Sequence, residues 1–354
     1  MNKKKSVKAI DLFCGAGGLT HGLLLSKINV VAGYDIEESC RYAYEYNNNA
    51  KFFNQDVTFL RGEEISHHLE GADYSLLAGC APCQPFSTYS RTKNKPNGVK
   101  DDKWDLLSSF GRLISEVTPD FVTMENVPGL VEQEVFQNFL NLLSKLKYCV
   151  DYKVVYCPDY GMAQTRKRLV LVASKLGEIH LAKPTHTLED YKTVSDVIKS
   201  LPKINSGETD KNDPLHRASI LTPLNLKRIR ASFPGGSWLD WPEELRANCH
   251  KKITGKTYPS VYGRMSWDKP SPTITTQCNG FGNGRFGHPE QDRAISLREA
   301  AMLQSFPSNY RFLPLEEKGS IASLAKMIGN AVPVRLGQIV GDSIHAAITN
   351  LEQP

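Results

Sequence analysis

Cys83, in the segment "AGCAPCQPFS" (residues 78–87), is the side chain in this chain with the widest choice of chemistry. A thiolate attacks electrophilic carbon, ligates metals or forms disulfides. Cys80 and Cys83 have the spacing of half a zinc site, but no second Cys-x-x-Cys and no paired histidines complete it, so we predict no metal site. A redox pair needs a helix directly after it, and "QPFSTYSRTKNKPNGVKDD" is typical of a long loop. Two interpretations of Cys83 remain open, a nucleophile and a buried packing residue.

The position of Cys83 along the predicted sheet favours a role at a ligand site. It follows the predicted strand "DYSLLAG" (73–79), and Glu125 lies near the end of the predicted strand "DFVTMEN" (120–126). Ligands of open α/β sheets bind beyond the carboxyl ends of the strands. A thiol and a carboxylate are therefore expected at the same edge of the sheet.

The segment "DLFCGAGGLTHG" has the composition of a turn that approaches a ligand. Gly15, Gly17 and Gly18 permit a tight turn into a helix, and Asp35 ends the next predicted strand, where an acid accepts hydrogen bonds from ribose hydroxyls. The spacing is not Gly-x-Gly-x-x-Gly and no phosphate-neutralising residues lie nearby, so S-adenosylmethionine fits better than NAD. Asp56 follows a predicted third strand; it either accepts a hydrogen bond from the adenine amino group or is a surface aspartate before a turn.

Short apolar runs alternate with helical patterns in the first half of the chain. This alternation predicts an α/β fold with a doubly wound, mostly parallel sheet. The predicted strands are 7–13, 29–35, 73–79, 120–126 and 168–174, and the predicted helices are 19–28, 37–48, 105–117 and 135–147.

From about residue 183 the composition changes to Pro, Gly, Asn and Trp with scattered Arg and Lys, which is typical of loops and short strands. Helical patterns return at 296–306 and 320–332. We therefore expect a catalytic and cofactor-binding domain of residues 1–185 plus 319–354, and a second, smaller domain of residues 186–318.

Composition limits the protein class without deciding it. The chain has 354 residues, 40% of them hydrophobic, and a net charge of +5, which suits a polyanionic partner and many ordinary enzymes alike. Eight cysteines without a secretory leader indicate reduced thiols. The apolar run after the basic N-terminus is short and interrupted by Asp11, so we expect a cytoplasmic protein without a membrane span.

Six motifs in a fixed order resemble the DNA cytosine-5 methyltransferases. They extend over nearly the whole chain, so their order is far more specific than any one of them. The motifs are "DLFCGAGG", "PCQPFS" with Cys83, "ENV" with Glu125, "QTRKR" with Gln164, Arg166 and Arg168, "SLREAAMLQSFP", and "GNAV" with Asn330.

This resemblance implies a reaction and catalytic roles. A methyl group passes from S-adenosylmethionine to carbon 5 of a flipped-out cytosine in duplex DNA, leaving S-adenosylhomocysteine. Cys83 adds to carbon 6, Arg166 favours its thiolate, Glu125 contacts the ring nitrogen 3 edge, and Arg168 contacts the cytosine carbonyl oxygen and orients Glu125. No residue is assigned as the base that removes the carbon 5 proton.

The resemblance also implies a cofactor pocket. Phe13 packs on the adenine and Ile36 covers its other face, although many family members have an aromatic residue where this chain has Ile36. Phe13, Ile36 and Leu106 could equally be core residues. The full set of predicted cofactor residues is Phe13, Gly15, Gly17, Gly18, Asp35, Ile36, Asp56, Pro82, Leu106, Asn330 and Val332.

Two regions are predicted to contact duplex DNA. The polar loop 87–101 would close over DNA, or is simply solvated, and residues 186–318 would read base edges through donor-rich turns. The predicted DNA-binding residues are Gln84, Ser87, Arg91, Lys93, Gln164, Arg264, Gln277, Asn279 and Arg285.

Three other functions stay open: a cytosine-5 tRNA methyltransferase on the same scaffold, a catalytically silent DNA-binding protein and a nicotinamide-dependent oxidoreductase. The resemblance favours a monomer on DNA from a bacterial restriction-modification system, in which a cognate endonuclease acts separately.

Overall fold

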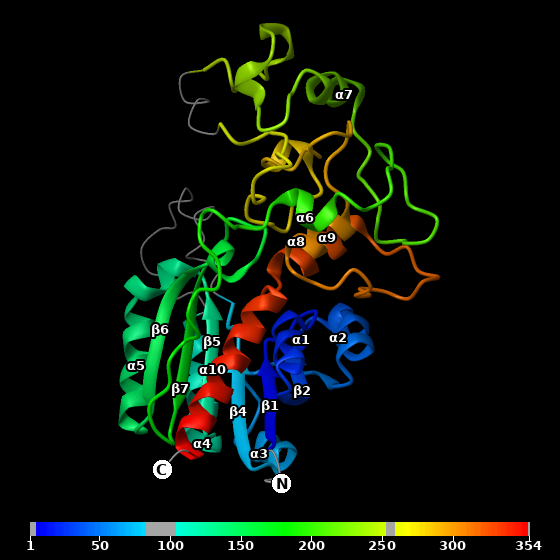
Figure 1. The fold of residues 1–354 in the computed structure, drawn as a ribbon. Helices are drawn as coiled ribbons and strands as arrows, with labels where there is room; N and C mark the ends of the chain where they lie inside the picture. Colours follow the sequence, from blue (N-terminus) through cyan, green and yellow to red (C-terminus); the bar gives the residue numbers. More distant parts are fainter. Residues whose placement is uncertain (1–4, 83–103, 253–258, 353–354) are drawn as a thin grey trace. The chain divides into compact units, whose positions relative to one another are not determined.

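The computed structural model describes residues 5–82, 104–252 and 259–352, and the chain forms two compact units (Figure 1). The first unit comprises Met1–Tyr156, Lys167–Pro184 and Val332–Pro354, and the second comprises Cys157–Arg166 and Thr185–Ala331. Two segments expected in the catalytic domain, 157–166 and 319–331, therefore belong to the second unit. Gln164 pairs with Ser271 in an isolated bridge, which explains the first of these assignments.

The first unit contains a seven-stranded sheet of order β3-β2-β1-β4-β5-β7-β6. The first five of these strands pair in parallel, and β7 is antiparallel to both of its neighbours. This arrangement confirms the mostly parallel, doubly wound sheet. The strands are β1 (Val7–Leu12), β2 (Asn29–Asp35), β3 (Lys51–Asn54), β4 (Tyr74–Gly79), β5 (Phe121–Asn126), β6 (Cys149–Tyr156) and β7 (Lys167–Ser174).

Helices cover both faces of this sheet. The chain moves outward from β1 through α1 and α2, returns through α3, and then moves the other way through α4. Because parallel crossovers are right-handed, the two directions place their helices on opposite faces and leave a switch point between β1 and β4. The helices of this unit are α1 (Gly18–Leu25), α2 (Arg41–Asn48), α3 (Gly62–Leu69), α4 (Trp104–Val117), α5 (Glu134–Lys145) and α10 (Val334–Glu352).

Strand β6 and helices α3 and α10 of the first unit were not predicted. Strand β6, "CVDYKVVY", is the edge strand and is largely exposed, so it lacks the continuous apolar run that marks the inner strands. Helix α3, "GEEISHHL", buries only Gly62, Ile65 and Leu69, which is a weak apolar pattern for a helix of this length.

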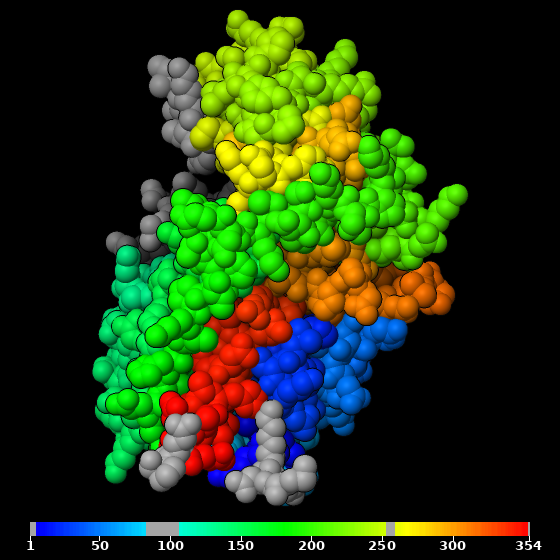
Figure 2. Space-filling model, in the orientation of Figure 1, coloured from blue at the N-terminus to red at the C-terminus, as the bar shows by residue number. Residues whose placement is uncertain are grey.

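Helices α1 and α10 contact each other through their backbones. A Cβ atom on Gly22 would lie 2.1 Å from the Val334 carbonyl oxygen, and one on Gly337 would lie 2.6 Å from the Leu19 carbonyl oxygen. Figure 2 shows the red C-terminal segment against the blue N-terminal segment. Because α1 begins at the glycine turn, this contact anchors the turn to the C-terminal helix.

Gly22→Ala is expected to lower the free energy of unfolding. Alanine favours a helix by about 1 kcal/mol over glycine, but the added methyl group overlaps backbone atoms, an overpacking that costs about 1–3 kcal/mol or more. Urea denaturation would measure the difference. Asn350→Ala, on an exposed position of α10, is the control and should not destabilise. Unchanged stability of Gly22→Ala would contradict the close backbone contact.

The second unit has little regular structure. An aromatic core contains Trp238, Trp241 and Phe281, and the Arg228 guanidinium lies 5.5 Å from the Trp241 ring centroid. Its α-helices are α6 (Val194–Ile198), α7 (Pro223–Arg230), α8 (Leu297–Leu303) and α9 (Ile321–Asn330). The 3-10 helices described in the two units are η1 (Glu38–Cys40), η3 (Pro128–Glu132), η4 (Cys157–Tyr160), η5 (Trp238–Asp240), η6 (Glu243–Leu245) and η8 (Phe281–Asn283).

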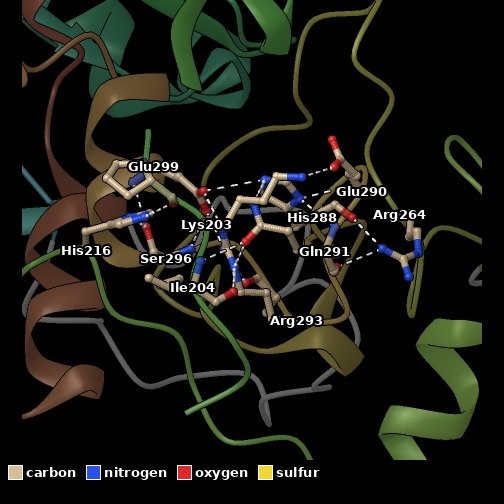
Figure 3. Close-up of polar contacts among 12 residues, drawn as sticks. Lys203, Ile204, His216, Arg264, His288, Glu290, Gln291, Arg293, Ser296 and Glu299 are labelled. Carbon is tan, nitrogen blue, oxygen red and sulfur yellow. Dashed lines mark hydrogen bonds and ion pairs between the residues drawn. The ribbon is translucent and has the colours of Figure 1, made fainter. Parts of the chain in front are cut away.

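A buried polar network lies at the start of α8 (Figure 3). Arg293 donates two hydrogen bonds of 2.7 Å to the two carboxylate oxygens of Glu299, and both side chains are essentially inaccessible. Glu299 also accepts a bond of 2.7 Å from the Ser296 backbone, and Arg293 Nε donates to the Ile204 carbonyl at 3.1 Å. This network joins the segment around residue 204 to the predicted motif "SLREAAMLQSFP".

No helix within residues 5–82, 104–252 and 259–352 is long and apolar enough to cross a membrane.

Candidate active site

Buried Glu125 and half-buried Arg168 form an ion pair at one edge of the sheet. Glu125 lies near the end of β5, and the antiparallel strand β7 begins at that same edge. Arg168 Nε lies 2.7 Å from Glu125 Oε1, with side-chain exposures of 15% and 7%. The Arg168 Nη1 donates to the Lys167 carbonyl at 2.8 Å. The reversal of strand direction therefore brings together two residues that are far apart in the sequence.

The segment that leads to Cys83 is bonded to the same edge. Cys80 Sγ donates to Glu125 Oε2 at 2.9 Å, and Asn126 Nδ2 donates to the Ala81 carbonyl at 3.0 Å. Sequence reasoning assigned no role to Cys80 or Asn126. Pro82 is exposed. The predicted residues Cys83, Gln84, Ser87, Arg91 and Lys93 lie outside the described residues.

The glycine turn has an unusual backbone. Phe13, Gly15 and Gly17 have φ angles of 59°, 49° and 84°. A positive φ is strained for a phenylalanine, and such strain concentrates at functional sites. The Gly15 backbone donates to Asp35 Oδ2 at 2.8 Å, which ties the turn to the end of β2.

Asp35 is held by backbone donors on both carboxylate oxygens. Its Oδ1 accepts a bond of 2.9 Å from the Glu37 backbone, in addition to the Gly15 bond on Oδ2. Burial raises the pKa of Asp35, and the backbone donors oppose that shift. Each oxygen still has a lone pair for a further donor such as a ribose hydroxyl.

Several predicted cofactor residues have surfaces suited to a nucleoside. Ile36, next to Asp35, is 70% exposed, and Phe13 and Leu106 are half-buried against the core of the first unit. Asp56 Oδ1 accepts two bonds from Thr58, at 2.8 Å from its backbone and 2.7 Å from its hydroxyl, so a contact to adenine would fall to Oδ2. An apolar surface beside a half-buried carboxylate fits an adenosine.

Three further predicted cofactor residues differ in accessibility. Gly18 is buried in α1, Val332 is buried in the first unit, and Asn330 is exposed at the end of α9 in the second unit.

Asp11 is a buried carboxyl group close to this turn. It is 1% exposed, its Oδ2 accepts a bond of 2.6 Å from the Thr20 hydroxyl, and its Oδ1 has no hydrogen-bond partner among the described residues. Burial raises the pKa of Asp11 to about 7 from an ordinary 3.8, and the negative charge of Asp35 adds to the shift.

This raised pKa makes stability depend on pH with a definite sign. Between pH 3.8 and about 7 the folded protein retains a proton that the unfolded chain releases, so Asp11 contributes stability at low pH that is lost as the pH rises toward 7. The loss is on the order of 3–4 kcal/mol. Urea unfolding of the wild type and Asp11→Asn at several pH values should show this decline only in the wild type. Identical slopes for the two proteins would contradict it.

Arg166 is buried in the second unit at 3% exposure. Its Nη1 donates to the Ile274 carbonyl at 2.9 Å and its Nη2 lies 3.5 Å from the Gly329 carbonyl. Its predicted effect on the Cys83 thiol stays a prediction.

Two of the predicted DNA contacts, Gln164 and Arg264, are buried, and their side chains are hydrogen-bonded inside the second unit. Gln164 is 0% exposed; its Nε2 donates to the Leu303 carbonyl at 3.1 Å, and its Oε1 accepts from the Ile274 backbone at 2.7 Å. Arg264 is 5% exposed and its three nitrogens all donate within the protein. The acceptors of Arg264 belong to Ile229, Ser232, His288, Gln291 and Asp292.

The other predicted base readers differ in accessibility. Gln277 is exposed, and Asn279 is half-buried with its Nδ2 donating to Ser219 Oγ at 3.1 Å. Arg285 is half-buried and donates from Nη1 to the Gly236 carbonyl at 2.9 Å. Their contacts to DNA stay predictions.

Comparison with known proteins gives the family. The chain is 53% identical over 347 residues to the Type II methylase M.HgiDII of Herpetosiphon aurantiacus, covering 97% of this chain and 96% of the relative. It is 31% identical to the Type II methyltransferase M1.HphI of Haemophilus parahaemolyticus, covering 98% and 88% of the two chains.

Solved structures show the same fold. A prophage-encoded DNA modification methyltransferase of E. coli superimposes with a TM-score of 0.73 at 23% identity, covering 97% of this chain and 100% of the other. Spodoptera frugiperda DNMT2 superimposes with a TM-score of 0.65 at 17% identity, covering 98% and 99%. The family model for C-5 cytosine-specific DNA methylases matches residues 7–346. This chain therefore belongs to the C-5 cytosine-specific DNA methylase family and is a DNA (cytosine-5)-methyltransferase.

Proposed function

We propose that this enzyme methylates carbon 5 of a flipped-out cytosine in a specific duplex DNA sequence, through a covalent bond between Cys83 and carbon 6. The observation that carries the proposal is the ion pair of buried Glu125 with Arg168, in which Glu125 also accepts a hydrogen bond from the segment that precedes Cys83. A buried carboxylate at the ligand edge of an open sheet is a candidate to contact a base.

Covalent catalysis solves the chemical problem of this substrate. Cytosine carbon 5 is too weak a nucleophile to take a methyl group unaided, and addition of a thiolate to carbon 6 makes it enamine-like. A donor or proton at ring nitrogen 3 withdraws the charge that develops during the addition. Glu125, acting as an acid in its protonated form, is the proposed donor to nitrogen 3, and Arg168 is the proposed contact of the carbonyl oxygen.

The geometry of Glu125 supports this assignment. Arg168 Nε is close to Oε1 but not aligned as a hydrogen bond, and no other donor within the described residues bonds Oε1. Oε1, which is shielded from solvent, therefore keeps hydrogen-bonding capacity for a base edge that enters the site.

S-adenosylmethionine, the methyl donor of the family, supplies an electrophilic methyl group on a sulfonium. Asp35 would accept the ribose hydroxyls, and Ile36 and Phe13 would pack on the adenine. The glycine turn permits the close approach that this arrangement needs. Water is the proposed acceptor of the carbon 5 proton.

Duplex DNA is the proposed partner. Attack on carbon 6 comes from the face of the ring, so the cytosine must leave the stack at a cost of a few kcal/mol. The second unit is proposed to recognise the target sequence, with Gln277, Asn279 and Arg285 as the remaining candidates. We propose a monomer on DNA, with a cognate restriction endonuclease acting separately, as the Type II relatives suggest.

Bisulfite sequencing of DNA from cells that express the chain tests this function. One sequence motif should carry protected cytosines, and purified protein should transfer labelled methyl groups to duplex DNA and not to tRNA. Labelled tRNA with unlabelled DNA would support the tRNA enzyme, and no transfer to either would support a silent binding protein. Displacement of S-adenosylmethionine by NAD would support an oxidoreductase.

A further inference from the structure

We infer that Cys80 is a positioning residue for methyl transfer, whose thiol donates to Glu125 Oε2 and thereby leaves Oε1 for the cytosine edge. This inference rests on the proposed role of Glu125. It concerns the first cysteine of the Cys-x-x-Cys pair, which the proposed chemistry otherwise leaves unused.

The two side chains are placed together by strand register. Strands β4 and β5 pair in parallel with Gly79 opposite Met124, so Cys80, the first residue after β4, follows in register with Glu125 of β5. The Cys80 backbone donates to the Leu12 carbonyl at 3.2 Å, which fixes it to β1 on the other side. The Sγ to Oε2 contact of 2.9 Å therefore forms one residue beyond β4, where the pairing of β4 with β5 and the backbone bond to β1 hold Cys80 in place.

The Cys80 thiol remains a donor at neutral pH. Burial raises its pKa well above the ordinary 9.0, and the negative charge of Glu125 raises it further. A protonated, buried thiol donates a hydrogen bond and does not compete as a nucleophile.

The thiol also limits how Arg168 can engage the carboxylate. Arginine prefers to grip both oxygens of a carboxylate with two parallel hydrogen bonds. Here the thiol occupies Oε2, while Arg168 Nε lies 2.7 Å from Oε1 without aligning as a hydrogen bond. Without the thiol, Arg168 would be free to take both oxygens and leave less capacity for the substrate.

Comparison of Cys80→Ala with Cys80→Ser tests this role. Serine keeps a donor at the same position and alanine removes it. At saturating DNA and S-adenosylmethionine, Cys80→Ala should lower the single-turnover rate of methyl transfer by about tenfold to one hundredfold, and Cys80→Ser should recover to within about threefold of the wild type. Dissociation constants for DNA and cofactor should change little. Equal rates for the wild type and Cys80→Ala, or equal losses in both variants, would overturn the role.

A double-mutant cycle separates positioning from packing. In a Glu125→Gln background, Cys80→Ala should change the rate by less than about twofold, because its effect acts through the carboxylate. Full additivity of the two losses would overturn the inference. Thermal unfolding of each variant identifies losses that come from misfolding.

A spectroscopic measurement tests the hydrogen bond independently of activity. In the wild type, the infrared S–H stretching band of Cys80 is identified by its absence from Cys80→Ala. This band should lie below the frequency of a free thiol, and Glu125→Gln should shift it to a higher frequency. A band at the free-thiol frequency would overturn the inference even if the protein proved inactive on DNA. Conversely, a wild type that shows the shifted band but no methylation would count against the proposed function alone.

Discussion

Cys83→Ser is expected to abolish methyl transfer to DNA, with a loss on the order of 10⁴-fold or more. The hydroxyl of serine is a much weaker nucleophile than a thiolate at neutral pH, so carbon 6 is not attacked and carbon 5 is not activated. DNA binding should persist, because phosphate and base contacts do not depend on the covalent bond. Labelled-methyl incorporation and a filter-binding assay measure the two properties. Cys149→Ser, which alters an exposed cysteine, is the control and should keep both.

The proposed covalent bond between Cys83 and cytosine carbon 6 can be tested by trapping it. Duplex DNA with 5-fluorocytosine at the target position should become covalently attached to the wild type in the presence of S-adenosylmethionine, since fluorine cannot leave carbon 5 as a proton does. Cys83→Ser should form no adduct. Undiminished methyl transfer by that variant would rule out the proposed nucleophile.

The inner strands could be predicted because each is a short apolar run that ends at polar residues. The predicted range 29–35 is the range that β2 occupies, and the other four predicted strands agree within one residue at each end. Strand β6 could not be found in this way, because this largely exposed edge strand mixes polar with apolar residues and has no continuous apolar run. The composition of β7 also does not predict that it pairs antiparallel to β5, the pairing that brings Arg168 close to Glu125.

The placement of the candidate site residues could be predicted where it depends on position along a strand, and not where it depends on packing. Glu125 and Asp35 follow from strand ends, but the contact of Cys80 with Glu125 depends on the register of β4 and β5. Gln164 and Arg264 were predicted to contact DNA, and their buried hydrogen bonds could not be foreseen, because their donors suit bases and buried carbonyls equally. A loop-rich unit needs such side chains to donate hydrogen bonds to its buried backbone carbonyls. Residue type alone therefore cannot distinguish a side chain that bonds the backbone from one that contacts DNA.

Glu299→Gln is expected to cause a large loss of stability in the second unit. Arg293 is 0% exposed and both of its hydrogen bonds to a carboxylate are made with Glu299. Removing the negative charge leaves the guanidinium buried without a counter-charge, a change that typically costs about 3–5 kcal/mol. An amide also provides only one acceptor where Arg293 and the Ser296 backbone use two oxygens.

Urea denaturation followed by tryptophan fluorescence measures this loss, because Trp238 and Trp241 lie in the core of the second unit. Glu290→Gln removes an exposed carboxylate paired with Lys203 and is the matched control, for which we expect little change. Equal stability of the two variants would mean that the network in Figure 3 is dispensable. If Glu299→Gln unfolds the second unit first, binding of the target sequence should fall before cofactor binding does, because the predicted cofactor residues other than Asn330 belong to the first unit.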